Sequence, residues 1–268
     1  MLRGLGWLRN AIDFPMRQFF RLRRPGCQLP CEPKDGLFPV EALPEVERLV
    51  GAYGLEGWAK ESGRTDFAAS LFYAQMLERA WQEAGVTLPE RATVLDAGCG
   101  DWFYVQPLYG LLLRYGTEGP RSVQLDGVEL DAFALYEGFH SRYDWATAYV
   151  GGCEGARYHS TDIRRYDRSV DMALMLFPFL FPDDLRRWGL PRRYLRPAEY
   201  LRHVWRLVKP GGWLVLANLG EEERVEQHRL LAECAIPIRW WVTHTSPLFN
   251  YAEPRFVTLV RKEPGAAH

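Results

Sequence analysis

An acidic residue and two glycines follow a short hydrophobic run near the middle of the chain. The run begins at Thr93, and Asp96, Gly98 and Gly100 come directly after it. Because glycine has no Cβ, a backbone with glycines at these positions can bend sharply, and a ligand can come close to it. The pattern predicts a buried strand that ends in a tight turn and continues into a helix, with a ligand site at the turn.

Two further acidic residues stand at the ends of apolar segments. Glu129 follows Gly127 and Val128, and Asp162 lies between Thr161 and Ile163. Strands that alternate with helices give a parallel sheet, whose ligands lie beyond the carboxyl ends of its strands. Asp96, Glu129 and Asp162 are therefore expected along one edge of a sheet.

Two later segments complete the pattern. The apolar run 170–177 reads as a fourth strand, and Lys209-Pro210-Gly211-Gly212 reads as a turn that leads into a fifth strand at Trp213. Over residues 70–262, these motifs and their order resemble those of class I S-adenosylmethionine-dependent methyltransferases, which have a Rossmann-like fold.

The resemblance implies that S-adenosylmethionine is the cofactor. Gly98 and Gly100 would approach its methionine part, with Asp96 holding the turn and the ammonium group. Glu129 would accept hydrogen bonds from both ribose hydroxyls, which a carboxylate with two oxygens can do. Asp162 would accept from the adenine amine. The implied cofactor-binding residues are Asp96, Gly98, Gly100, Glu129, Asp162, Ile163 and Phe177.

The chain departs from the family at Trp102. The family usually has a third glycine at this position, and a tryptophan there either closes part of the methionine pocket or packs the next helix against the sheet. Two function classes remain open. The first is a methyltransferase, and the second is a non-catalytic protein with the same fold that acts as a binding or assembly partner.

The predicted fold is α/β. It consists of a doubly wound, mostly parallel seven-stranded sheet with helices on both faces and a C-terminal antiparallel hairpin formed by residues 236–245 and 255–261. Residues 1–64 are expected to form an N-terminal helical extension or lid. Residues 65–268 are expected to form the cofactor-binding domain.

The segment after the fourth strand bears on the acceptor. Relatives that methylate amines carry an Asn-Pro-Pro-aromatic tetrad there, whereas this chain has Leu176-Phe177-Pro178-Phe179. The absent amide argues against that type of N-methylation. Phe179 is expected to contact a small acceptor that is planar or hydrophobic, and O- or C-methylation is favoured. The alternative is that these side chains only complete the core.

The arginine-rich segment 186–196 is a second candidate for acceptor binding. It is expected to be a loop in which Trp188, Arg192 and Arg193 stack on a ring or bind a carboxylate or phosphate. The alternative is a solvated surface loop.

Two histidines are candidates for a general base, because a neutral imidazole can accept a proton near pH 7. His244 lies near the end of the sixth strand, and His159 lies three residues before Asp162. For each, the alternative is a structural role in the core.

Composition limits the remaining function classes. A net charge of −1 over 268 residues argues against a nucleic-acid partner. Five cysteines without zinc spacing predict free thiols and no metal site. The longest apolar run, 172–181, is about half the length a bilayer requires, and no signal peptide is evident. These features predict a cytoplasmic protein.

Residues 1–24 predict an amphipathic helix with a break near Pro15. The segment contains six arginines and one aspartate, and its apolar side chains recur at helical steps. They are Leu5, Leu8, Ile12, Met16 and Phe19. Such a helix either covers the protein's own cofactor site or binds peripherally to an anionic membrane.

Overall fold

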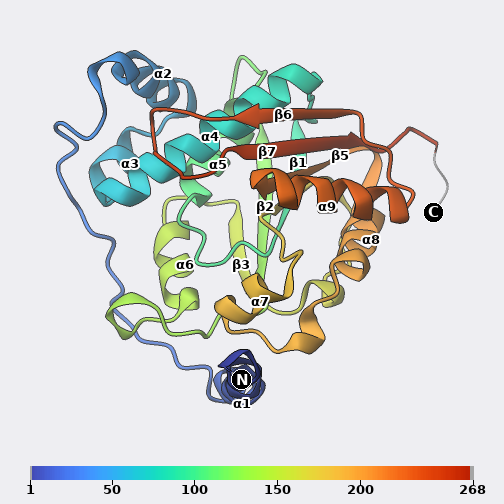
Figure 1. Ribbon diagram of the computed structural model, residues 1–268. Helices are drawn as coiled ribbons and strands as arrows, with labels where there is room; N and C mark the ends of the chain where they lie inside the picture. Colours follow the sequence, from blue (N-terminus) through green and yellow to red (C-terminus); the bar gives the residue numbers. More distant parts are fainter. Residues whose placement is uncertain (1, 266–268) are drawn as a thin grey trace.

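A seven-stranded sheet forms the centre of the protein in a computed structural model, which describes residues 2–265 (Figure 1). Met1 and residues 266–268, at the outer ends of the two predicted domains, lie outside the described residues, as do the side chains of residues 2–4 and 137. The strand order is β3-β2-β1-β4-β5-β7-β6. The strands are β1 (Arg91–Ala97), β2 (Ser122–Glu129), β3 (Ala156–Ser160), β4 (Val170–Leu176), β5 (Val208–Leu219), β6 (Trp240–His244) and β7 (Arg255–Arg261).

The predicted sheet is confirmed, including its closing hairpin. Strands β1 to β5 are parallel, and β7 runs antiparallel to both β5 and β6. The register pairs Asp96 on β1 with Gly127 on β2 and Leu174 on β4. The carboxyl ends of the parallel strands therefore meet at one edge, where the acidic residues were expected.

Helices cover both faces of the sheet, because successive side chains of a strand point to opposite faces. Val94 joins one hydrophobic core with α4, α5 and α6, and Leu95 joins a second core with α8 and α9. The bounds are α4 (Arg64–Ala84), α5 (Val105–Arg114), α6 (Arg142–Val150), α8 (Pro197–Leu207) and α9 (Gly220–Glu233).

The N-terminal 64 residues divide into two parts in space. Helices α2 (Leu43–Tyr53) and α3 (Glu56–Glu61) contribute Leu49, Tyr53 and Trp58 to the same core as α4. Helix α1 (Leu2–Phe20) lies apart from them, below α7 (Pro182–Trp188), at the end of the molecule where the parallel strands finish (Figure 1).

The predicted break at Pro15 is wrong, since α1 continues through it to Phe20. Proline removes one backbone hydrogen bond from a helix. Here Asn10 and Arg17, on either side of Pro15, each bond to other parts of the protein. These contacts hold both halves of α1 in line.

Short 3-10 turns complete the structure. They are η1 (Val40–Ala42), η2 (Glu137–Phe139), η3 (Ile163–Arg165) and η4 (Arg192–Tyr194). The segment 186–196, expected to be a loop, is instead the last turn of α7 followed by η4. Within residues 2–265, the helices are all too short or too polar to cross a membrane.

Candidate functional site

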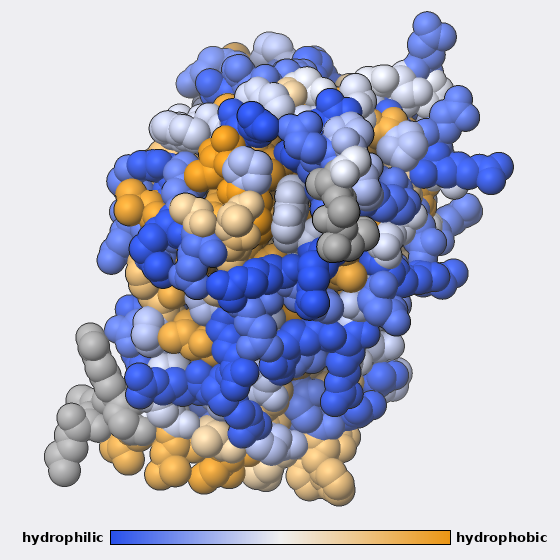
Figure 2. Space-filling model, turned by 90° about the vertical axis from the view of Figure 1, so that its right-hand side faces the viewer, coloured by the Kyte–Doolittle hydropathy of each residue, from blue (hydrophilic) through white to orange (hydrophobic). Residues whose placement is uncertain are grey.

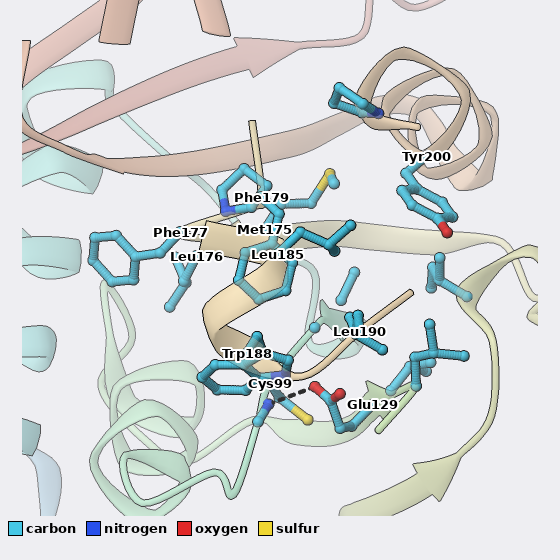
Figure 3. Close-up of a pocket in the computed structure, with 18 of the residues that line it drawn as sticks. Cys99, Glu129, Met175, Leu176, Phe177, Phe179, Leu185, Trp188, Leu190 and Tyr200 are labelled. Atoms are coloured by element: carbon cyan, nitrogen blue, oxygen red, sulfur yellow. Dashed lines mark hydrogen bonds between the residues drawn. The ribbon is translucent and has the colours of Figure 1, made fainter. Parts of the chain in front are cut away.

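A cavity of about 410 Å³ opens at the carboxyl ends of β1, β2 and β4 (Figure 3). Its volume lies within the range of small-molecule sites, about 300–1,000 Å³. Gly98, Gly100 and Glu129 line one end of it, with Asp162 and Ile163 nearby. The cavity therefore brings together residues from three separate motifs.

The glycine turn presents bare backbone to the cavity. Gly98 has φ 83° and Gly100 has φ 65°, values that other residues rarely adopt. A Cβ built on Gly98 has no heavy atom within 4 Å. The N–H of Gly98 donates to the carbonyl of Val128 at 2.8 Å, which fixes the turn to β2.

Glu129 is buried beside this turn. Its Oε2 accepts from the N–H of Gly100 at 3.0 Å, and its Oε1 accepts from the N–H of Asp131 at 2.7 Å. Burial raises the pKa of Glu129, while the charge of Arg142 opposes that rise. Each carboxylate oxygen keeps capacity for a second donor, so the side chain is fixed in place and can still accept two hydroxyl hydrogen bonds.

Asp162 lines the cavity as the N-cap of η3. Its Oδ1 accepts from the N–H of Arg164 at 3.0 Å, and its Oδ2 pairs with Arg164 Nη2 at 2.6 Å. Burial alone would raise the pKa of Asp162, but the hydrogen bonds from Arg164 bring it below the ordinary value. Asp162 is therefore an ionised acceptor with one cation already beside it.

Asp96 lies behind the turn and does not line the cavity. Its Oδ2 accepts from Trp102 Nε1 and from the Tyr104 hydroxyl, both at 2.8 Å. Its Oδ1 is buried without a partner among the described residues, and burial raises its pKa to about 6. Asp96 thus holds the turn and keeps one acceptor atom unused.

Trp102 packs against the sheet, which decides between the two predictions made for it. Its side chain is completely buried, and a Cβ on Gly127 would lie 2.6 Å from its ring. Its φ is 63°, in the region that the family's glycine would favour. Trp102 therefore fills space beneath the turn and does not line the cavity.

Aromatic side chains also line much of the cavity. The Tyr73 ring from α4 stacks on Tyr104 at 4.9 Å between centroids, and Phe177 lies 5.6 Å from Tyr73. The aromatic lining residues are Tyr73, Phe103, Tyr104, Tyr136, Phe177, Phe179, Trp188, Tyr194 and Tyr200. Such a lining accommodates a flat or apolar molecule.

Trp188 covers the glycine turn from the opposite side. Its ring lies 3.5 Å from the position that a Cβ of Gly100 would take, close to Cys99 and Glu129 (Figure 3). Phe179 packs beside it at 5.5 Å, and the Arg142 guanidinium stacks on it at 3.7 Å. Two of the four residues predicted to contact the acceptor, Phe179 and Trp188, thus line the cavity.

The two histidines lie outside the cavity. His159 Nε2 is 2.8 Å from Asp126 Oδ1 on the neighbouring strand. His244 is buried against Phe72, and burial together with the charge of Arg79 lowers its pKa to about 4. His244 is therefore neutral at pH 7 but has no access to the cavity.

Arg192 and Arg193 also lie outside the cavity, in the exposed turn η4. The Arg193 guanidinium stacks on Tyr194 at 5.2 Å, and Tyr194 in turn lines the cavity. The arginine pair is thus at the rim, behind an aromatic ring.

Asp101 lines the cavity and was missed by the sequence analysis. Burial raises its pKa to about 6, while the charge of Arg142 lowers it. Its position directly after Gly100 was the available signal, since a residue there must lie at the strand end. Tyr73 and Tyr200 were also missed, because no motif connects α4 or α8 to the turn.

No protein-family model matches the sequence, and no curated protein matches it. Many solved structures share the fold. A putative class I S-adenosylmethionine-dependent methyltransferase from Listeria monocytogenes is 15% identical with a TM-score of 0.50, over 75% of this chain and 61% of that one.

Two further structures are similar at lower scores. Magnesium protoporphyrin IX methyltransferase from Synechocystis is 14% identical with a TM-score of 0.48, over 84% of this chain and 99% of that one. A putative RNA methyltransferase from Pyrococcus horikoshii is 13% identical with a TM-score of 0.49, over 72% and 85%. Identities this low carry information about the fold alone. Together with the strand order, the similarity to the Listeria structure shows that this chain has the fold of the class I S-adenosylmethionine-dependent methyltransferases.

Proposed function

We propose that the protein is an S-adenosylmethionine-dependent methyltransferase that acts on a small, planar or hydrophobic acceptor. The observation that carries this proposal is the buried Glu129 beside the bare turn at Gly98 and Gly100, in the lining of a largely aromatic cavity. The residues fit the cofactor, because Glu129 keeps capacity for two hydroxyl donors and Gly98 leaves room beside its backbone.

The bound cofactor would supply an activated methyl group. Gly98 and Gly100 would hold its methionine part, Glu129 its ribose, and Asp162 with Ile163 its adenine. Asp101, ionised at pH 7, would attract the positive charge at the methionine end. The chain's own contribution would be binding and alignment of the acceptor.

The acceptor would occupy the aromatic end of the cavity. Tyr73, Tyr104 and Phe177 enclose that end, and Phe179 stands beside Trp188. Burial raises the pKa values of Tyr73 and Tyr104 well above the ordinary value, so both hydroxyls stay neutral, and the Tyr104 hydroxyl donates to Asp96. An apolar ring that carries a hydroxyl or an activated carbon suits this lining, which favours O- or C-methylation.

Calorimetric titration with S-adenosylhomocysteine tests cofactor binding. We expect Glu129→Ala to weaken binding at least about tenfold, because it removes hydrogen bonds to a charged acceptor. Glu118→Ala, in an exposed turn away from the cavity, should bind like the wild type. Turnover would then be sought as release of S-adenosylhomocysteine in a panel of phenols and apolar carboxylic acids.

A non-catalytic binding protein is the second candidate, and the Trp188 ring over Gly100 favours it. In that case the ring would permanently occupy the space beside the turn. If the wild type gave neither heat nor a thermal shift at about millimolar S-adenosylhomocysteine, the enzyme proposal would fail and this candidate would replace it.

A further inference from the structure

Helix α1 turns its hydrophobic stripe away from the protein. Leu5, Leu8, Ile12, Met16 and Phe19 lie on one side of the helix because they recur at three- and four-residue steps, and each is between 51% and 81% exposed. Figure 2 shows hydrophobic side chains along the lower edge of the molecule, the edge at which Figure 1 places α1. Monomeric soluble proteins rarely expose a continuous apolar surface unless it binds something.

Polar contacts on the opposite side fix this orientation. The Asn10 amide donates to the carbonyls of Arg186 at 2.9 Å and Leu190 at 3.2 Å. Arg17 forms a bidentate pair with the buried Asp131, with distances of 3.1 and 2.8 Å. Rotating α1 to bury its stripe would break these bonds and leave the Asp131 carboxylate with less compensation, so the stripe faces outward in the folded protein.

The apolar surface continues beyond the end of α1. Phe20 and Leu22 are exposed, and Phe139 is 79% exposed on a nearby turn. Arg24 Nη1 donates to the carbonyl of Gly138 at 3.2 Å, which brings that turn beside the chain leaving α1. The exposed surface is therefore wider than one helix.

Positive charge accompanies the stripe. Arg9, Arg21, Arg23 and Arg24 are exposed. Asp13, which pairs with Arg9 at 3.5 Å, is the one acidic residue between positions 5 and 24. Large apolar side chains with flanking arginines are typical of helices that lie in the interface of a bilayer.

We propose that this outer face of α1 binds the surface of a membrane that contains anionic lipids. Anionic headgroups would neutralise the exposed arginines while the stripe enters the acyl boundary. A second copy of the chain fits less well, because pairing two such faces would bring like charges together. This binding does not depend on methyl transfer.

Flotation of the full-length protein with vesicles tests the proposal. One set of vesicles is phosphatidylcholine alone, and the other also contains phosphatidylglycerol. The stripe variant carries Leu8→Ser, Ile12→Ser and Phe19→Ser. The matched control carries Val40→Ser, Val225→Ser and Trp241→Ser, which replace exposed apolar residues elsewhere on the surface. Thermal melting verifies that each variant is folded.

We expect the wild type and the control to float with the anionic vesicles and to bind phosphatidylcholine alone more weakly. The stripe variant should lose at least about tenfold in partitioning, given the apolar area it removes. Arg21→Gln with Arg23→Gln should weaken binding to the anionic vesicles only. Equal recovery of the wild type and the stripe variant would overturn the proposal.

Sedimentation of the same proteins without lipid tests the alternative that the outer face of α1 binds a second copy of the chain. A wild type that does not float but dimerises, with a stripe variant that is monomeric, would show that the face joins two copies. That result would also overturn the membrane proposal. A wild type that is monomeric and floats would support it.

Discussion

The two sides of the cavity at Gly100, one formed by the strand ends and the other by the covering segment around Trp188, are built in different ways. On the strand side, backbone atoms form the surface, and two backbone N–H groups fix the carboxylate of Glu129. On the cover side, the surface consists of side chains such as Trp188 and Leu190, which come from α7 and the chain after it. A surface made of backbone depends on strand register, whereas one made of side chains depends on how distant segments pack. The first is therefore fixed by a local motif, and the second is not.

The largest expected effect is a loss of stability on removing Trp102, which packs beneath the strand side of the cavity. Trp102→Ala should lower the free energy of unfolding by about 3–5 kcal/mol, because the ring is completely buried over Gly127 and donates to Asp96. Chemical denaturation measures the loss. Trp241→Ala, at a half-exposed ring, is the control and should cost much less. A loss below about 1 kcal/mol for Trp102→Ala would contradict a supporting role.

Gly100→Val tests whether ligand binding on the strand side depends on the backbone conformation of the glycine turn. It should weaken S-adenosylhomocysteine binding by about a hundredfold, or about 2.7 kcal/mol. The reason is that valine disfavours the φ of 65° and projects toward the Trp188 ring. Calorimetry compares it with Gly119→Val, in an exposed turn with free space. Binding unchanged in both variants would show that the ligand does not approach this turn.

His244 is buried in the core outside the cavity, so it should affect the pH dependence of stability and leave ligand binding unaffected. Its pKa falls from 6.5 to about 4 on folding, so below pH 6.5 the unfolded chain takes up the proton first. Stability should therefore fall as the pH decreases, by about 2 kcal/mol from this residue at about pH 5. Denaturation across this range is compared with His244→Phe, which should have a flatter profile. Identical profiles would mean that the imidazole is solvated in the folded protein.

Trp188→Ala removes the ring that covers Gly100 and should have the smallest effect, a change in ligand affinity. If the ring has to move aside for a ligand at Gly100, removing it should strengthen S-adenosylhomocysteine binding by about fivefold, near 1 kcal/mol. Phe179→Ala, beside it in the cavity, serves as the comparison. A weaker affinity in Trp188→Ala would indicate that the ring contacts the ligand directly, and the two sides would then act as one surface.

This difference explains what the sequence could predict. Gly98, Gly100 and Glu129 were expected at one edge, and the structure brings them together because parallel strands place their carboxyl ends there. The parallel sheet was predicted from the alternation of strands and helices, and the hairpin from the two strands that close the chain.

The remaining features depend on packing that no local pattern encodes. The arginine-rich segment reads as a polar loop, but α7 folds it so that Trp188 enters the cavity and Arg192 does not. Tyr73 reaches the cavity from α4, which lies far from the motifs in sequence. The amphipathic pattern of residues 1–24 predicted a helix correctly but not the direction of its apolar side. That direction follows from Asn10 and Arg17, whose partners are more than a hundred residues away.

The bonds of Asn10 have a thermodynamic consequence. They join α1 to the carbonyls of Arg186 and Leu190, which lie two residues before and two residues after Trp188, the residue that covers Gly100. Binding free energies at two linked sites are reciprocal. If a ligand in the cavity displaced the Trp188 ring and shifted these carbonyls, it would change the affinity of α1 for the membrane proposed above, and the membrane would change the affinity of the cavity by the same factor. The strength of this coupling is bounded by what the Asn10 and Arg17 contacts contribute, so weakening either one should uncouple the surface helix from the cavity.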